Sequence, residues 1–122
     1  MNNKEFKKKL IHKSFSFSKK IIGLVNNLPR SQSNKVVSDQ LLRSSTSIGA
    51  NIVEAQSASS KKDFTNFLSY SLKSGNECKY WLVLLEQTSN GVKEEVKELA
   101  LELDELVKML ASSIITLRGV NK

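Results

Sequence analysis

The sequence has few residues that interrupt helices or build metal and disulfide sites. It has one proline, Pro29, and five glycines, too few for a sheet-rich fold, which needs many tight turns. A single cysteine, Cys78, cannot form an internal disulfide or a cysteine metal cluster within one chain, so we expect a small core side chain. There is one histidine, His12, whereas the di-iron sites of helix bundles need two Glu-x-x-His motifs. These shortages favour long helices and argue against a metal centre.

Sequence patterns typical of enzymes, membrane proteins and secreted proteins are also missing. No apolar stretch approaches the ~20 residues that cross a bilayer, and the N-terminal segment lacks the apolar run of a secretory signal. The phosphate-binding patterns GxxxxGK[ST] and GxGxxG and the nucleophile pattern GxSxG do not occur. We therefore predict a cytoplasmic protein that is not an enzyme, with no cofactor, no small-molecule substrate and no membrane contact.

Apolar residues recur at the helical period in four successive segments. Pro29 ends the first segment, Ser60 followed by Asp63 is a typical start for the third, and Gly91 after an asparagine is a typical helix end. The short connections between the later segments make sequential helices antiparallel. The sequence therefore predicts one all-α domain, an antiparallel up-down four-helix bundle. The expected helices cover residues 4–28, 34–57, 61–89 and 92–118.

The second segment is apolar over nearly half of its circumference, more than one bundle core can cover. We therefore predict a homo-oligomer in which part of this helix contacts another subunit. Ser45, Gly49 and Val53 lie one turn apart on this segment, and the missing side chain of Gly49 would allow a close approach of two backbones.

The net charge of +7 is concentrated in the first half of the chain, which contains ten Lys and Arg residues but only two acidic residues, Glu5 and Asp39. A localised basic surface favours polyanionic partners, and phosphate contacts need only lysines at suitable spacing. A solvated lysine-rich helix face remains the alternative. The candidate nucleic-acid-binding residues are Lys8, Lys9, Lys13, Lys19, Lys20, Arg30 and Lys35.

Two polar stripes flank the core faces of the second and third helices. Arginine–carboxylate pairing between them would form a buried network that fixes helix register or subunit geometry. Ligand binding or catalysis by Glu54 and Glu77 is the alternative. Trp81 with Tyr70 could instead anchor a partner protein, because aromatic residues are enriched at interface hot spots. The residues predicted to form the network are Arg43, Ser47, Asn51, Glu54, Glu77 and Trp81.

Residues 41–55, LLRSSTSIGANIVEA, resemble the signature of the family called 23S ribosomal RNA intervening-sequence proteins. The similarity continues through residues 61–64, KKDF, and includes Ser74 and Glu77, while Ala55 stands where the family favours glycine. The resemblance implies a four-helix bundle in a ring-like homo-oligomer, typically a pentamer, with no known catalytic activity. It also extends to the accessory protein of diversity-generating retroelements, a basic pentamer associated with nucleic acid and a reverse transcriptase.

Two functions from different classes remain open at this stage. The first is an oligomer that binds the backbone of RNA or DNA through the basic face of the first helix. The second is an assembly scaffold that organises a partner protein without contacting nucleic acid. Binding of nucleic acid that weakens with salt would separate the two.

Overall fold

The computed structural model describes residues 3–119, and four helices contain most of them. The predicted all-α four-helix bundle is confirmed. Every helix boundary falls within two residues of the position expected from the sequence. The observed helices are α1 (Asn3–Asn26), α2 (Gln32–Ala55), α3 (Lys61–Thr88) and α4 (Lys93–Arg118).

The connection between α1 and α2 differs most from the prediction. The first helix ends at Asn26 rather than at residue 28, because the next backbone N–H groups bond three residues back, to Leu24 O at 3.2 Å and to Val25 O at 3.3 Å. The second helix begins two residues early because Ser31 caps it, its Oγ accepting from the backbone N–H of Asn34 at 3.0 Å. Such a cap satisfies one of the N–H groups that a helix start leaves free.

The other helix boundaries follow the predicted signals more closely. Ser60 caps α3, its Oγ accepting from the backbone N–H of Asp63 at 3.0 Å. Gly91, in the turn between α3 and α4, has a φ of 81°, which is strained for residues with a side chain. The second helix ends at Ala55 rather than at residue 57, and Gln56 follows in a right-handed conformation.

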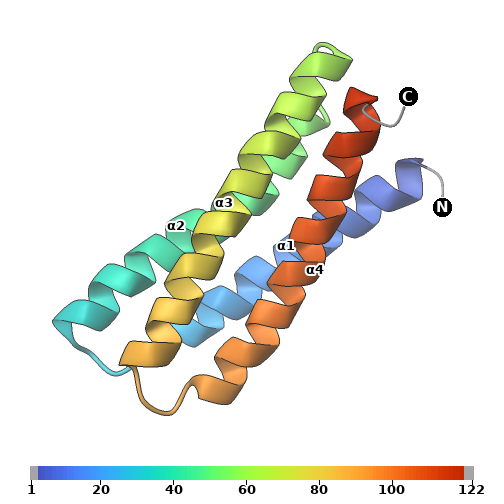
Figure 1. Cartoon of the computed structure of the whole chain (residues 1–122). Coiled ribbons are helices and arrows are strands. Elements are labelled where there is room, and N and C mark those ends of the chain that lie inside the picture. Colours follow the sequence, from blue (N-terminus) through green and yellow to red (C-terminus); the bar gives the residue numbers. More distant parts are fainter. Residues whose placement is uncertain (1–2, 120–122) are drawn as a thin grey trace.

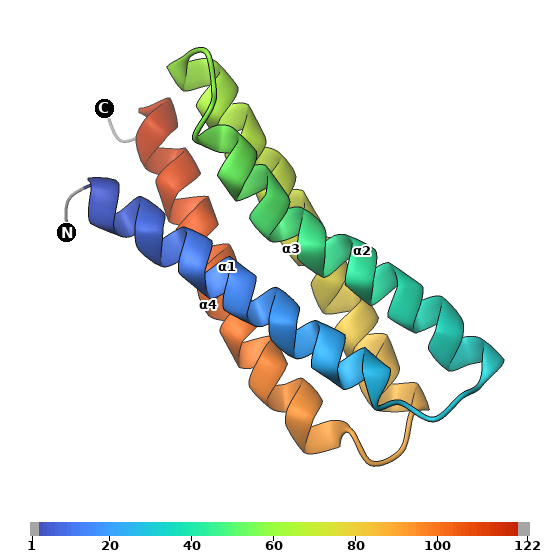
Figure 2. The same cartoon turned by 180° about the vertical axis from the view of Figure 1, so that it is seen from behind.

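The helices form a closed cycle in which each packs against two others, α1 with α2 and α4, and α3 with α2 and α4. Consecutive helices run in opposite directions (Figure 1). Seen from behind, α1 lies against both α2 and α4 (Figure 2). The start of α1, the end of α4 and the α2–α3 connection therefore share one end of the bundle. The most extensive pairing is that of α2 with α3.

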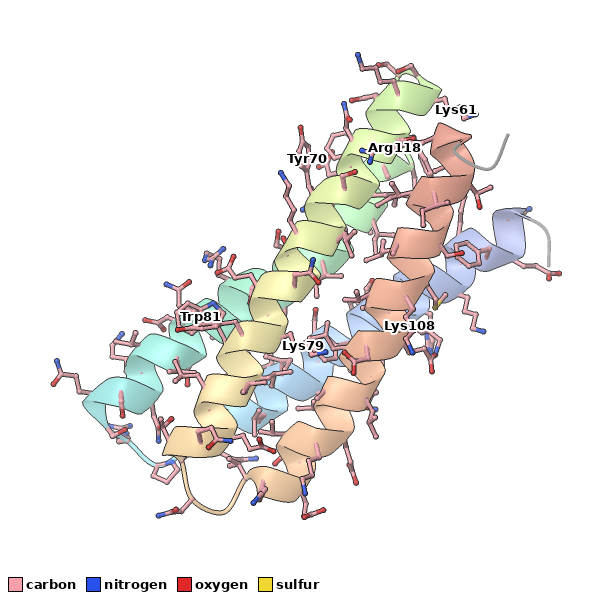
Figure 3. All side chains as sticks on the ribbon, in the orientation of Figure 1. Lys61, Tyr70, Lys79, Trp81, Lys108 and Arg118 are labelled. Carbon is pink, nitrogen blue, oxygen red and sulfur yellow. The ribbon has the colours of Figure 1, made fainter. Side chains whose placement is uncertain are left out.

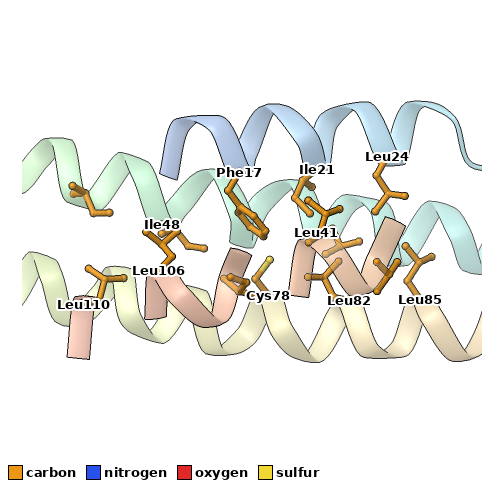
Figure 4. Close-up of a cluster of buried hydrophobic side chains, with 14 of the residues drawn as sticks. Phe17, Ile21, Leu24, Leu41, Ile48, Cys78, Leu82, Leu85, Leu106 and Leu110 are labelled. Carbon is orange, nitrogen blue, oxygen red and sulfur yellow. The ribbon is translucent and has the colours of Figure 1, made fainter. Parts of the chain in front are cut away.

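The core runs along the bundle and receives side chains from all four helices (Figure 4). On α2, the residues that share one face by their helical spacing are all buried, and they are Val37, Leu41, Ser44, Ser45, Ile48, Ile52 and Ala55. Cys78 is fully buried, as predicted, and burial raises the pKa of its thiol to about 12. The thiol is therefore protonated at neutral pH and lacks the thiolate that reacts with electrophiles. The largest fully buried side chains are Phe17, Ile21, Leu24, Leu41, Ile48, Ile52, Leu68, Leu82, Leu85, Leu103, Leu106 and Leu110.

Small residues allow α1 to approach α2 closely. A Cβ atom added at Gly49 would lie 3.1 Å from the Oγ of Ser14, so the predicted close approach at Gly49 is confirmed. One turn away, the Ser18 hydroxyl donates to the backbone carbonyl of Ser45 at 3.1 Å. Val53, which the sequence placed on the same apolar sector, is 55% exposed. Part of the wide apolar arc of α2 is therefore open in a single chain.

None of the helices in the described part of the chain is long and apolar enough to cross a bilayer.

Candidate functional site

A charged cluster joins α2 to α3 on the outer side of the bundle. The guanidinium of Arg43 forms an ion pair with the carboxylate of Glu77. It also donates to the side-chain oxygen of Gln40, from Nε at 3.0 Å and from Nη2 at 2.7 Å. The indole N–H of Trp81 donates to Glu77 Oε2 at 2.9 Å. Each helix supplies two members about one turn apart, so a single register of α2 against α3 assembles all four.

Hydrogen bonding controls the ionisation of Glu77. Its pKa lies below the usual value because the Trp81 indole and then the Arg43 guanidinium donate to its charged form. The cluster is only partly buried in one chain, with 55% of the Arg43 side chain and 38% of the Glu77 side chain exposed. The sequence predicted this pairing, but it gave no sign that Gln40 would share the guanidinium.

A second polar cluster lies one turn further along the same pair of helices. The Ser74 hydroxyl donates to the Ser47 hydroxyl at 2.9 Å. The side-chain amide of Asn51 donates to the Ser47 carbonyl at 2.9 Å and to its hydroxyl at 3.1 Å. Glu54, by contrast, is exposed and makes no ion pair or side-chain hydrogen bond within residues 3–119. The structure therefore places five of the six predicted network residues in two separate clusters and leaves Glu54 out.

Aromatic and aliphatic side chains extend these clusters into a partly exposed surface. A shallow groove between α2 and α3 is lined by Val36, Trp81 and Leu84 among others, and Val36 is 54% exposed. The ring of Tyr80 packs edge-on against Trp81 at a centroid distance of 4.9 Å. Figure 3 shows Trp81 and Tyr70 on α3, and Tyr70 is half exposed. We call the two polar clusters and this groove the outer α2–α3 face.

The predicted basic side of α1 is partly paired with acidic residues of α4. Lys13 forms an ion pair with Glu105, and Lys20 pairs with Glu102 at 2.8 Å. The hydrogen bond and charge of Lys13 lower the pKa of Glu105. Lys35 pairs with Asp39 one turn away on α2, at 3.2 Å. These three candidates are therefore not free cations in the folded chain.

The remaining candidates from the sequence are exposed and form no ion pair among residues 3–119, although the charge of Lys9 helps to lower the pKa of Glu105. They are Lys8, Lys9, Lys19 and Arg30. The ammonium of Lys19 lies over the exposed ring of Phe15, 5.8 Å from its centroid. Lys8 and Lys9 lie in the first turns of α1, whereas Arg30 lies beyond its other end.

Three helices bring their basic residues together where α1 starts and α4 ends. Figure 3 shows Lys61 and Arg118 at this end of the bundle. The carboxylates within the same turns are those of Glu5, Glu54 and Asp63, and Asp63 already accepts from the backbone N–H of Ser59 at 3.1 Å. The basic residues, which we call the basic end, are Lys4, Lys7, Lys8, Lys9, Lys61, Lys62 and Arg118.

The basic end was only partly visible in the sequence. Lys61, Lys62 and Arg118 lie far along the chain from the lysines of α1, and only the topology brings them together. At the opposite end of the bundle, basic residues such as Lys93 and Lys97 are mixed with the acidic residues that start α4. Within residues 3–119, no three His, Cys, Asp or Glu side chains gather as they would around a metal ion.

A sequence model of the family described as 23S rRNA-intervening sequence protein matches residues 7–112. The chain belongs to this family. The matched range reaches from the first turns of α1 into α4 and includes both polar clusters of the outer α2–α3 face. No curated protein sequence matches the chain.

A solved structure supports the same conclusion for this intervening-sequence protein. It is a crystal structure from Bacteroides thetaiotaomicron VPI-5482, described as a protein of unknown function from the S23 ribosomal protein family. The two chains are 40% identical, and the match covers 89% of this chain and 97% of the other. The TM-score of 0.83 shows the same fold. The chain therefore shares both its family and its fold with this structure.

Proposed function

We propose that this chain is a non-enzymatic, oligomeric protein that binds the phosphate backbone of nucleic acid. The observation that carries the proposal is the basic end, where seven Lys and Arg residues and only three carboxylates lie in the turns of three helices that meet at one end of the bundle. Basic side chains that neutralise phosphates release condensed counterions, which is the main source of affinity for a sequence-independent binder. The family name links these proteins with ribosomal RNA, which agrees with an RNA ligand.

The ion pairs of α1 decide which lysines should contribute most. Lys8 and Lys9 are exposed, so a phosphate can replace water around them at little cost. Lys13 and Lys20 are paired with Glu105 and Glu102, so binding a phosphate there either breaks these ion pairs or leaves a carboxylate close to the phosphate. We therefore assign the main phosphate contacts to the basic end rather than to the whole length of α1.

Self-association would strengthen this binding by repeating the basic end in one particle. The outer α2–α3 face offers a contact surface, because its aromatic groove and its Arg43–Glu77 pair are half exposed in one chain. We propose that this face joins subunits, and the family resemblance favours a pentamer. Sedimentation equilibrium that finds only a 13.7 kDa species at micromolar concentration would contradict this part of the proposal.

The test measures the binding of short single-stranded RNA and DNA by fluorescence anisotropy across a salt series. We expect little sequence preference and a log–log slope of about −0.7 per phosphate contacted. The double variant Lys8→Gln/Lys62→Gln should flatten the slope for both nucleic acids, since charge alone does not distinguish RNA from DNA.

Two matched double variants remove the same charge elsewhere. Lys93→Gln/Lys97→Gln at the opposite end should leave the slope unchanged. Lys13→Gln/Lys20→Gln should flatten the slope less than the basic-end variant does, because these lysines are paired with carboxylates in the folded chain. Equal effects of all three variants would mean that net charge, not the basic end, determines binding.

An assembly scaffold is the second candidate, and two aromatic residues on α3 favour it, the partly buried Trp81 and the half-exposed Tyr70. Trp81 and Tyr70 are of the types that dominate interface hot spots. If the wild-type chain retains no nucleic acid even at low salt, the scaffold becomes the better proposal. Substituting Tyr70 should then weaken capture of the partner protein, and the lysine variants should not.

A further inference from the structure

A hollow of about 420 Å³ opens at the basic end, between the first turns of α1 and α3, the last turns of α4, and Gln56, which directly follows α2. Its apolar walls are Phe6 and Leu10 of α1, Phe64 and Leu68 of α3, and Leu117 of α4. Ligand pockets commonly span about 300–1,000 Å³ and are mostly apolar with a few polar groups. This hollow is at the small end of that range.

The sequence of α4 explains why the chain does not fill this space. Leu106 and Leu110 occupy the core further along the helix, whereas Ser112, Ser113 and Thr116 face the hollow. The Ser113 hydroxyl donates to the Met109 carbonyl of its own helix at 2.9 Å, so it does not require a partner in the hollow. Small side chains on one wall and large apolar ones on the others leave an open volume.

The charged side chains that line the hollow all have the same sign. Lys7 and Lys61 belong to its lining, and no carboxylate does. The Lys7 ammonium lies 4.9 Å from the ring centroid of Phe64, over the apolar wall. An apolar cavity with ammonium groups beside it suits a ligand with one anionic group and one unbranched apolar chain.

We propose that this hollow binds a free straight-chain fatty acid of medium length. The alkyl chain lies against Phe6, Phe64 and Leu68, and the carboxylate lies beside the ammonium groups of Lys7 and Lys61. Lys7 and Lys61 also belong to the basic end, whereas the apolar walls do not, so a substitution that fills the hollow can remove fatty-acid binding without removing a basic side chain.

The first experiment titrates the full chain calorimetrically with hexanoate, octanoate, decanoate and dodecanoate below their micelle concentrations. Each added CH₂ should lower the Kd about four-fold while the chain is still being buried. The gain should stop once the hollow is full. Methyl decanoate and decylammonium should bind more weakly than decanoate, because the first lacks the charge and the second is repelled.

The second experiment uses variants with a matched control. Lys7→Gln and Lys61→Gln should each weaken decanoate binding about two- to five-fold, and neither should change the binding of methyl decanoate. Lys19→Gln, which removes the comparable lysine–phenylalanine contact over Phe15, should bind decanoate like wild type. Ser113→Phe should fill the hollow and abolish binding, with RNA binding retained.

Thr116→Phe blocks the hollow from an exposed position, so it keeps the test valid if Ser113→Phe does not fold. Failure of decanoate to bind wild type overturns the proposal. So does equal binding of decanoate and decylammonium, or decanoate binding that survives Thr116→Phe in a folded protein.

Discussion

Replacing Glu77 by glutamine tests whether the outer α2–α3 face is covered in the assembled protein. In one chain, the side chains of Arg43 and Glu77 are 55% and 38% exposed. Exposed ion pairs contribute about 0.2–1 kcal/mol, and glutamine can still accept from the indole of Trp81. We therefore expect the free energy of unfolding of the isolated chain to fall by no more than about 1 kcal/mol.

An assembly that covers this face should respond much more strongly. The substitution then leaves the guanidinium of Arg43 without its counter-charge in a contact from which water is excluded. Breaking such a pair costs about 3–5 kcal/mol. Gln40, which accepts from the same guanidinium at 3.0 and 2.7 Å, offsets part of this cost. A net loss of about 2 kcal/mol corresponds to a dissociation constant raised about 30-fold.

Two measurements separate these effects. Urea unfolding of a diluted sample gives the stability of the single chain, and sedimentation velocity over a concentration series gives the assembly constant. Glu98→Gln removes an exposed charge from α4 and should alter neither measurement beyond a few tenths of a kcal/mol. Unchanged sedimentation of Glu77→Gln would refute the assignment of this face to a subunit contact.

Three further predictions concern single positions. Because the pKa of Glu77 is lowered in the folded chain, its ionised side chain contributes fully to the free energy of unfolding above pH 4.5, its ordinary pKa. This contribution is lost as pH falls through the folded pKa, so the free energies of unfolding of wild type and Glu77→Gln should become equal in acid. Ser71→Ala removes a buried bond of 2.8 Å to the Ile48 carbonyl and should cost about 0.5–1.5 kcal/mol in urea. Gly91→Ala should cost about 1–2 kcal/mol by thermal melting, since its φ is 81°, and an unchanged melting temperature would mean that the turn rearranges.

Helical periodicity was sufficient to assign the core because burial depends mainly on which side chains share a helix face. The buried residues of α2 are those that its spacing predicted. The pairing of Arg43 with Glu77 could also be anticipated, since both lie beside core faces of adjacent helices. Periodicity does not give the rotation of one helix about its axis relative to the next. That rotation decides that Gln40 accepts from the Arg43 guanidinium and that Glu54 lies outside the polar clusters.

The hollow at the basic end could not be predicted for a different reason. It depends on how far four helix ends diverge, and that distance follows from the whole core rather than from any local pattern. The sequence predicted no small-molecule substrate because it contains none of the common ligand-binding patterns. The lining residues Phe6, Phe64 and Leu117 look like ordinary core positions in the sequence, although all three are only partly buried.

Antiparallel packing explains why the excess charge of this protein collects at one end. The acidic residues of α4 all lie between positions 94 and 105, and residues 106–118 contain none. Because α1 and α4 run in opposite directions, the acidic part of α4 lies beside the middle and end of α1, where it pairs with Lys13 and Lys20. The first turns of α1 lie beside the part of α4 without carboxylates, so Lys8 and Lys9 form no ion pair with α4 in the described part of the chain. Adding a carboxylate to this part of α4 by Ser112→Glu should therefore weaken nucleic-acid binding more than Ala100→Glu, although the two variants have the same net charge.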